Sequence, residues 1–109
     1  MNLADLRALA KAVGFPDPVL AAAVAMAESK GDPFATNLSS GIPGKTLPER
    51  SFGLWQVNVL AHPEFDEKEL FGASYNAHAA LLISKSGTDW SHWSTYTDGT
   101  YRQYMGASA

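Results

Sequence analysis

The spacing of apolar residues near the N-terminus predicts an amphipathic helix over residues 3–13. Leucine, alanine and valine recur there at intervals of three and four, which places them on one helical face. Asn2 is suited to cap the first turn, and Gly14 to end the helix in a left-handed conformation. This helix is expected to pack against the segment that follows it.

The next segment, residues 18–30, is apolar on all sides. Every residue from Val19 to Ala27 is apolar, after which Glu28 introduces a carboxyl group and Gly31 is expected to end the segment. Asp17 can cap the helix, and proline is tolerated at its first position because the missing N–H has no helical partner there. A helix that is apolar all round is one that the rest of a domain surrounds.

Residues 32–50 differ in composition from the apolar segment before them. They are rich in proline, asparagine, serine, glycine and threonine and keep neither the helical nor the strand period, which predicts a long loop with room for a short hairpin. Loops of this length are uncommon in small domains and are often functional.

Residues 51–59 alternate between apolar and polar positions and predict a short strand. One tryptophan and two valines share a face, which is expected to pack, while the amides of Gln56 and Asn58 lie on the other. Trp55 is expected to form the floor of a cleft.

The C-terminal half predicts further helical structure. Residues 66–71 are expected to form one helical turn, and a third helix is expected to begin with Ser74 as its N-cap and to end at Gly87. Trp90 and Trp93 lie at helical spacing and are expected in the core more than on a binding surface. Tyrosines and a methionine form a last short helical stripe over residues 101–105.

The whole pattern indicates one α+β domain over residues 1–109, mostly α-helical with a small strand or hairpin element. The chain has 109 residues, of which 46% are hydrophobic and 17% charged, a globular composition. It contains no cysteine, which excludes disulfides and thiolate metal sites.

Charge and hydropathy limit the classes of partner that this chain is expected to bind. Eleven acidic and eight basic residues give a net charge of −3, which argues against a nucleic-acid binder that relies on phosphate contacts. The longest apolar run is far shorter than the roughly 20 residues that span a bilayer, and the N-terminus lacks the pattern of a secretory signal. We therefore expect no membrane insertion and delivery by another route.

Glu28 is the first candidate for chemistry. It follows nine apolar residues and lies in the last helical turn, where partial burial and the negative end of the helix dipole both raise the pKa of a carboxyl group. A carboxyl group that keeps its proton near neutral pH can act as a general acid. The alternative is a surface glutamate at a fraying helix end, paired with Lys30.

Other stretches favour the catalytic interpretation. Glu28-Ser29, then residues 51–56 (Ser-Phe-Gly-Leu-Trp-Gln), then Tyr75-Asn76-Ala77 resemble, in order and separation, the successive motifs of the lysozyme-like lytic transglycosylases. Residues 89–104, with their tryptophans, tyrosines and glycine, resemble the closing segment of the phage tail and lysin members. The resemblance implies a lysozyme-like domain.

The resemblance also implies a reaction. It is cleavage of the β-1,4 bond between N-acetylmuramic acid and N-acetylglucosamine in peptidoglycan, with Glu28 as acid and then base and a 1,6-anhydro product. That route needs one carboxylate, whereas ordinary glycosidases use two. Glu49 and Asp32 are candidates for a second carboxylate, Glu49 the stronger, and a hydrolytic muramidase remains the alternative. A glycan-binding or structural tail domain without turnover is the other alternative.

The resemblance implies contacts with substrate as well. Amide and hydroxyl side chains match the neutral donors and acceptors of sugars, and aromatic rings can cover apolar sugar faces. Ser29 is expected to orient Glu28 or to cap the helix end. The implied substrate-binding residues are Ser29, Ser51, Gln56, Asn58, Tyr75, Asn76 and Tyr96.

No cofactor is expected. His62, His78 and His92 lack the spacing of a metal site and are interpreted as surface or ordinary polar residues. The expected partners are peptidoglycan glycan strands, with the protein a monomer. Because an acidic chain gains nothing from electrostatic steering to anionic cell walls, we expect a module of a larger phage tail or virion protein, with a free-standing lysin as second choice.

Overall fold

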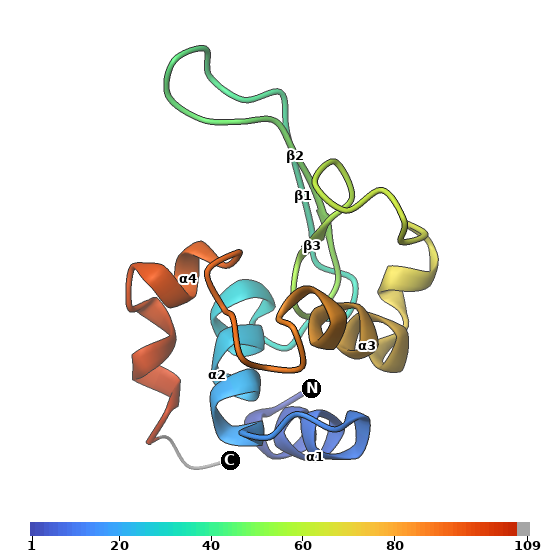
Figure 1. The fold of residues 1–109 in the computed structure, drawn as a ribbon, viewed down its shortest axis with the longest axis vertical. Helices are drawn as coiled ribbons and strands as arrows, with labels where there is room; N and C mark the ends of the chain where they lie inside the picture. Colours follow the sequence, from blue (N-terminus) through green and yellow to red (C-terminus); the bar gives the residue numbers. More distant parts are fainter. Residues whose placement is uncertain (107–109) are drawn as a thin grey trace.

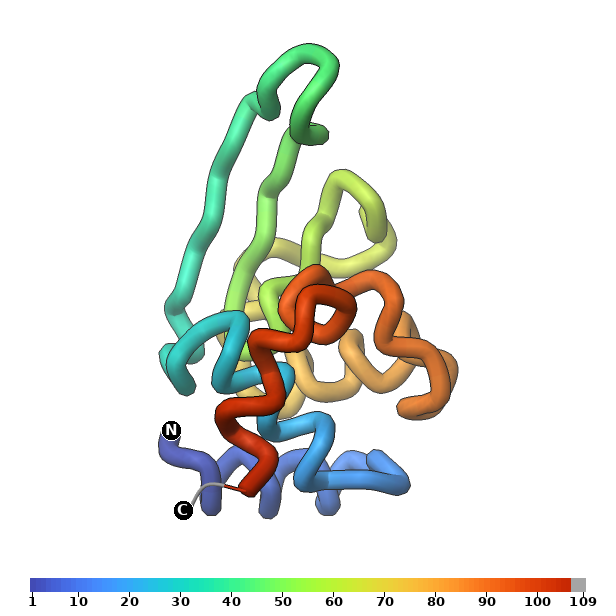
Figure 2. Tube along the Cα trace, turned by 90° about the vertical axis from the view of Figure 1, so that its left-hand side faces the viewer, coloured from blue at the N-terminus to red at the C-terminus, as the bar shows by residue number. Residues whose placement is uncertain are grey.

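A computed structural model describes residues 1–106 of the chain. Helices form the body of the molecule, and a long β-hairpin projects from it (Figure 1). The side view shows the same hairpin standing clear of the helices (Figure 2), and the longest dimension of the molecule is 39 Å. The predicted class, mostly α-helical with a small sheet, is confirmed.

Helix α1 spans Leu3–Val13 and has both predicted ends. The side chain of Asn2 accepts a hydrogen bond from the main-chain N–H of Asp5 at 2.8 Å, and Asp5 accepts one from Asn2 in return. Gly14 closes the helix with φ of 105°, a conformation that favours glycine. The buried leucines of this helix face α2.

Helix α2 spans Pro18–Ser29 and lies at the centre of the helical body (Figure 1). Asp17 caps it by accepting a hydrogen bond from the N–H of Leu20 at 3.1 Å. Lys30, not Gly31, is the first residue to leave the helix, with φ of 57°. Gly31 is needed for another reason, because a Cβ there would lie 1.8 Å from the carbonyl oxygen of Met1.

Three strands form one antiparallel sheet in the order β1-β2-β3. They are β1 (Thr36–Ser39), β2 (Glu49–Phe52) and β3 (Val57–Asn58). The prediction of a single strand over residues 51–59 is wrong, because a tight turn with positive φ at Gly53 (80°) and Gln56 (48°) divides it. The hairpin predicted within the loop over residues 32–50 is present as β1–β2, and it takes up most of that segment.

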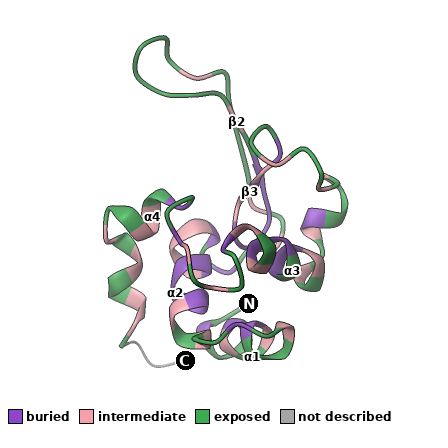
Figure 3. Ribbon diagram, in the orientation of Figure 1, coloured by how far each residue is buried: buried purple, intermediate pink, exposed green. Residues whose placement is uncertain are grey.

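The end of that hairpin, residues 40–48, is almost entirely exposed. It closes on itself through an isolated bridge between Ile42 and Thr46. Leu47 is 87% exposed, and Leu38 and Ile42 are also largely open to solvent. Figure 3 shows most of this part in the colour of exposed residues and the helical body in a mixture of all three colours.

The remaining helices complete the body around α2. A short 3-10 turn, η1 (Glu69–Phe71), precedes α3 (Ala73–Ile83), which is followed by α4 (Ser94–Thr97) and η2 (Thr100–Tyr104). The prediction for the N-terminus of α3 is wrong by two residues, because Gly72 rather than Ser74 is its N-cap. Its helical conformation also ends before Gly87, since Lys85 and Ser86 already have positive φ.

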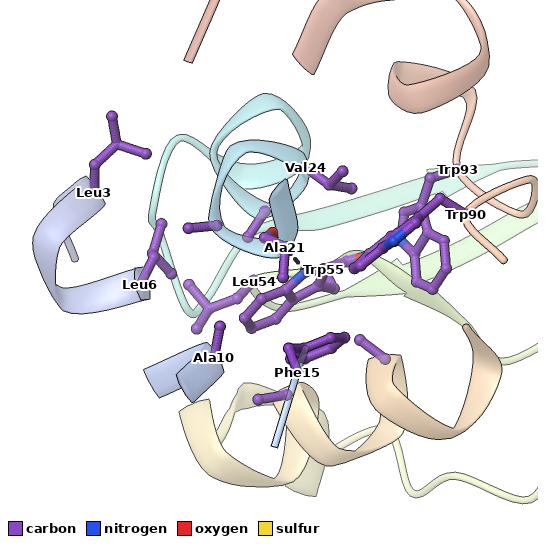
Figure 4. Close-up of a cluster of buried hydrophobic side chains, with 14 residues drawn as sticks. Leu3, Leu6, Ala10, Phe15, Ala21, Val24, Leu54, Trp55, Trp90 and Trp93 are labelled. Atoms are coloured by element: carbon purple, nitrogen blue, oxygen red, sulfur yellow. Dashed lines mark hydrogen bonds between the residues drawn. The ribbon is translucent and has the colours of Figure 1, made fainter. Parts of the chain in front are cut away.

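Aromatic rings fill the main core between α2 and the C-terminal segment (Figure 4). Trp55 is 0% exposed, so it is a core residue and not the floor of a cleft as predicted. Its indole Nε1–H donates to the carbonyl oxygen of Ala21 at 3.1 Å. Phe15 stacks on Trp55 and on Trp90, with ring centroids 5.8 Å and 5.5 Å away. Trp90 and Trp93 are buried, which confirms their expected place in the core.

A second, smaller core lies beneath the sheet and consists of Phe52, Val57, Val59, Leu70 and Ala79. It fixes β2 and β3 against η1 and α3, so the sheet is anchored at the base of the hairpin and free at its end. None of the helices within residues 1–106 has the length and apolarity needed to cross a bilayer.

Candidate active site

Glu28 lies in the last turn of α2, at the boundary between core and surface. The helix brings it there because residues 21–25 are buried and the helix ends at Ser29. The Glu28 side chain is partly buried, and burial is the largest cause of its raised pKa. A carboxyl group in this setting keeps its proton to higher pH than a solvated one, as a general acid requires.

Thr95 is the hydrogen-bond partner of this carboxyl group. Its hydroxyl donates to Oε2 of Glu28 at 2.5 Å, and its main-chain N–H hydrogen-bonds the same group. Both interactions favour the ionised form and lower the pKa, which opposes burial without cancelling it. Sequence reasoning missed Thr95 because a threonine 67 residues away carries no local signal.

Two other carboxylates act on Glu28 through space. Glu49, at the start of β2, raises the pKa of Glu28, and Asp98, just after α4, raises it further. Asp98 itself accepts hydrogen bonds from the hydroxyl and N–H of Thr100, which lower the pKa of Asp98 and keep it ionised. Glu28 is therefore flanked by negative charge from two different elements.

Three adjoining hollows run along β3 and the loop after it, from the hairpin toward the C-terminal segment. Glu49 and Arg50 line the one at the hairpin, Asn58 and Leu60 the middle one, and Asn58 and residues near His62 the third. Leu60 is shared by the first two, and Asn58 by the last two. Glu28 does not line them; Glu49 connects them to it electrostatically.

Asn58 lies beside these hollows with its oxygen already engaged. Its Oδ1 accepts from the N–H of Arg50 at 3.2 Å and from the N–H of Leu60 at 3.1 Å. Ser51 is buried and lies opposite Asn58 in the β2–β3 register. Of these two predicted binding residues, only Asn58 lines the hollows.

Gln56 also lines the third hollow, yet its amide group is used by the fold. Its Nε2 donates to the carbonyl oxygens of Ala35 and Gly53, each at 2.9 Å. These hydrogen bonds tie the start of the hairpin to the turn between β2 and β3. Gln56 therefore helps to hold the shape of the site.

Asn76 was predicted to line the cleft, but the structure buries it completely, at 0% exposure. Its Nδ2 donates to the carbonyl oxygens of Phe52 at 2.8 Å and Leu70 at 3.0 Å, and its Oδ1 accepts from the N–H of Trp55 at 2.8 Å. Asn76 thus joins α3 to the turn after β2, and has no surface left for a ligand.

Ser29 caps the helix end, which is the second of its two predicted roles. Its hydroxyl donates to the carbonyl oxygen of Ala25 at 3.0 Å and accepts from the N–H of Gly31 at 3.2 Å. At 6% exposure it offers almost no surface to a ligand.

The two tyrosines predicted to bind substrate pack against different cores, Tyr75 against the smaller one and Tyr96 against the main one. The hydroxyl of Tyr75 accepts a hydrogen bond from the N–H of Asp66 at 3.1 Å, and its ring packs edge-on against Phe65. Tyr96 stacks on Tyr101 with ring centroids 4.9 Å apart. Thr95, the residue before Tyr96, is the one that contacts Glu28.

Two of the histidines meet at the third hollow. The rings of His62 and His92 lie 5.4 Å apart. Burial is the largest cause that lowers the pKa of His62; Glu64 opposes it, and His92 lowers the pKa further. His78 is exposed on α3. Within residues 1–106, no group of three or more histidine, cysteine, aspartate or glutamate side chains is arranged to hold a metal ion.

The comparison with protein families decides the classification. The family model described as "Lysozyme like domain" matches residues 7–95, most of the chain. The chain is a lysozyme-like domain. The match spans Glu28, its hydrogen-bond partner Thr95 and the nearby carboxylate Glu49, whereas Asp98 lies beyond it.

Membership of the lysozyme-like family indicates an enzyme that cleaves the glycan strands of peptidoglycan. The resemblance based on the sequence motifs is confirmed at this level. No curated protein and no solved structure shows significant similarity to this lysozyme-like domain.

Proposed function

We propose that this lysozyme-like domain cleaves the β-1,4 bond between N-acetylmuramic acid and N-acetylglucosamine as a lytic transglycosylase, with Glu28 as its acid and base. The observation that carries this proposal is the setting of Glu28. A partly buried carboxyl group with a raised pKa lies at the end of an apolar helix and faces a hydroxyl donor. Each feature suits a group that must give up and regain one proton.

The reaction uses that proton twice. Glu28 protonates the glycosidic oxygen as the bond from the muramic acid C1 breaks, which releases the N-acetylglucosamine end as an alcohol. The carboxylate then accepts the proton of the muramic acid C6 hydroxyl as O6 bonds to C1, which closes the 1,6-anhydro ring and restores the acid. No water is consumed, so one carboxyl group is sufficient.

The adjoining hollows along β3 would hold the glycan strand. They pass Glu49 at one end and the paired histidines at the other. Asn58 and the main chain around it offer neutral hydrogen-bonding groups that suit acetamido and hydroxyl substituents. Arg50 is engaged by Glu67 in a two-point ion pair at the hairpin base.

Loss of turbidity of purified peptidoglycan tests the proposal. The wild-type protein should clear the suspension, and Glu28→Gln should not, because the amide cannot donate the required proton. Glu69→Gln, an exposed glutamate on η1, is the matched control and should clear like wild type. If wild type and Glu28→Gln both bind peptidoglycan without clearing it, the domain binds glycan without turnover and the enzyme proposal fails.

Hydrolysis with Glu49 as a second carboxylate is the alternative mechanism. Its support is that Glu49 lies close enough to Glu28 to raise its pKa. The mass of the soluble fragments separates the two reactions, because hydrolysis adds one water and the transglycosylase route adds none. A hydrated product, together with loss of turnover in Glu49→Gln that remains folded by circular dichroism, would replace the transglycosylase proposal by hydrolysis.

A further inference from the structure

Helix α4 is only four residues long, yet it is held firmly against the core from its N-terminal side. Trp93, its N-cap residue, is buried and donates its Nε1–H to the carbonyl oxygen of Trp55 at 2.7 Å. Trp55 is in turn bound to α2 through Ala21. The main core therefore fixes the position of Thr95, two residues beyond this anchor.

The chain after α4 is attached to the end of α2. Tyr96 stacks on Tyr101 at the start of η2, and the hydroxyl of Tyr104 accepts a hydrogen bond from Nζ of Lys30 at 3.1 Å. Figure 1 shows α4 and the following segment running beside α2. Thr95 is thus held from both sides at the end of the helix that carries Glu28.

We propose that Thr95 is a positioning residue of this site, whose hydroxyl holds the carboxyl group of Glu28 in one orientation at the end of α2. The hydroxyl donates to Oε2, so this oxygen is committed to α4 whenever Glu28 is ionised. A carboxyl group held in one orientation does not populate other rotamers, and even a small misplacement of a reacting group lowers the reaction rate strongly. The consequence for turnover rests on the proposed function; the contact with Glu28 does not.

The charges around Glu28 give Thr95 a second effect. Burial, Glu49 on β2 and Asp98 after α4 all raise the pKa of Glu28, and among the described residues both groups that lower it belong to Thr95. Lys30, the nearest cation along the chain, is directed to Tyr104 instead. Thr95 therefore lowers the upper pH at which Glu28 still carries a proton, against burial and the two carboxylates.

The same helix supplies a matched control. Thr97 is exposed, and its hydroxyl donates to the carbonyl oxygen of Ser94 at 3.2 Å, a local contact within α4. Thr97→Val removes the same hydroxyl from the same helix without touching Glu28. Thr95→Val removes the contact at nearly constant side-chain volume, and Thr95→Ser keeps the hydroxyl.

The decisive experiment is a pH titration of the Glu28 carboxyl carbon by NMR on glutamate-labelled protein, with the signal assigned through Glu28→Gln. In Thr95→Val the pKa of Glu28 should rise by about 1 pH unit, the size expected for losing one hydrogen bond to a charged group. Thr95→Ser and Thr97→Val should titrate like wild type. An unchanged pKa in Thr95→Val, or an equal rise in Thr97→Val, would overturn the proposal.

Turnover supplies the functional readout. In Thr95→Val the alkaline fall of the activity should move up by about 1 pH unit, and kcat should drop about tenfold with a smaller change in KM. Thr95→Ser should restore both. A wild type without turnover would refute the proposed function while the NMR titration still decides the role of Thr95. Normal kcat and pH profile in an active Thr95→Val would refute the positioning role itself.

Discussion

Replacing Asn76 by leucine should strongly destabilise the fold, because the side chain of Asn76 is buried and bonds main-chain groups. The change keeps the approximate volume of the side chain and removes three buried hydrogen bonds at once. The N–H of Trp55 then loses its acceptor, and the carbonyl oxygens of Phe52 and Leu70 each lose a donor. Because Asn76 is fully buried, water cannot replace these partners without opening the core.

The size of the effect follows from the groups left unpaired. A buried N–H without an acceptor costs about 2 kcal/mol, and each carbonyl oxygen, which has a second lone pair, costs about 1 kcal/mol. The expected loss is about 4 kcal/mol, a large share of the roughly 5–15 kcal/mol that stabilises a domain of this size. Unfolding in guanidinium chloride, followed by tryptophan fluorescence, measures it.

A second variant, Asn76→Asp, tests in which direction stability changes with pH. The new carboxyl group would be buried, so its pKa would be raised above its unfolded value, and the folded state would retain its proton to higher pH. Stability of this variant should therefore fall as the pH rises above about 4, the ordinary pKa of aspartate. Asn37→Leu, at an exposed position of β1, is the control and should change stability by less than about 1 kcal/mol.

The structural role of Asn76 would be refuted by one pattern of results. If Asn76→Leu lost less than about 1 kcal/mol and yet lost affinity for peptidoglycan, the side chain would have to reach substrate, against its burial here.

Two further predictions concern the same region. Gly53→Ala should destabilise the fold by about 3 kcal/mol or more and lower the melting temperature markedly, because φ is 80° and a Cβ would lie 2.3 Å from Nδ2 of Asn76. A melting temperature within 2 °C of wild type, about what a loss of a few tenths of a kcal/mol would give, would contradict this prediction. Glu28→Gln should raise thermal stability at neutral pH and have less effect under acid conditions, because the raised pKa of Glu28 costs stability once the pH exceeds its unfolded pKa. Melting curves at several pH values measure this, and an equal effect at every pH would show that burial does not perturb the carboxyl group.

Local sequence was sufficient for the first two helices but not for the ends of α3. Helix capping at Asn2, Asp17 and Gly14 depends on residues that are close together in the chain, and the periodicity of residues 3–13 specifies one buried face. The uninterrupted apolar run of α2 likewise determined that this helix is central. Glu28 stood out for the same reason, as the first charge after that run.

Tertiary structure alone decided how the site is built. Gln56 and Asn76 belong to motifs that suggest substrate contact, but their partners are main-chain groups brought near by folding. Which oxygen an amide meets depends on packing between α3, the turn after β2 and the start of the hairpin. No periodicity reports such contacts.

The sequence by itself therefore determined the helical body, the family resemblance and the candidate acid, because these depend on neighbouring residues and on the order of motifs. Only the tertiary structure decided what surrounds that acid. Thr95 reaches Glu28 across 67 residues because Trp93 is anchored in the core, and Glu49 faces it because β2 pairs with β3 and β1. Burial and electrostatic coupling arise from elements packed in space, so they exist only once the chain has folded.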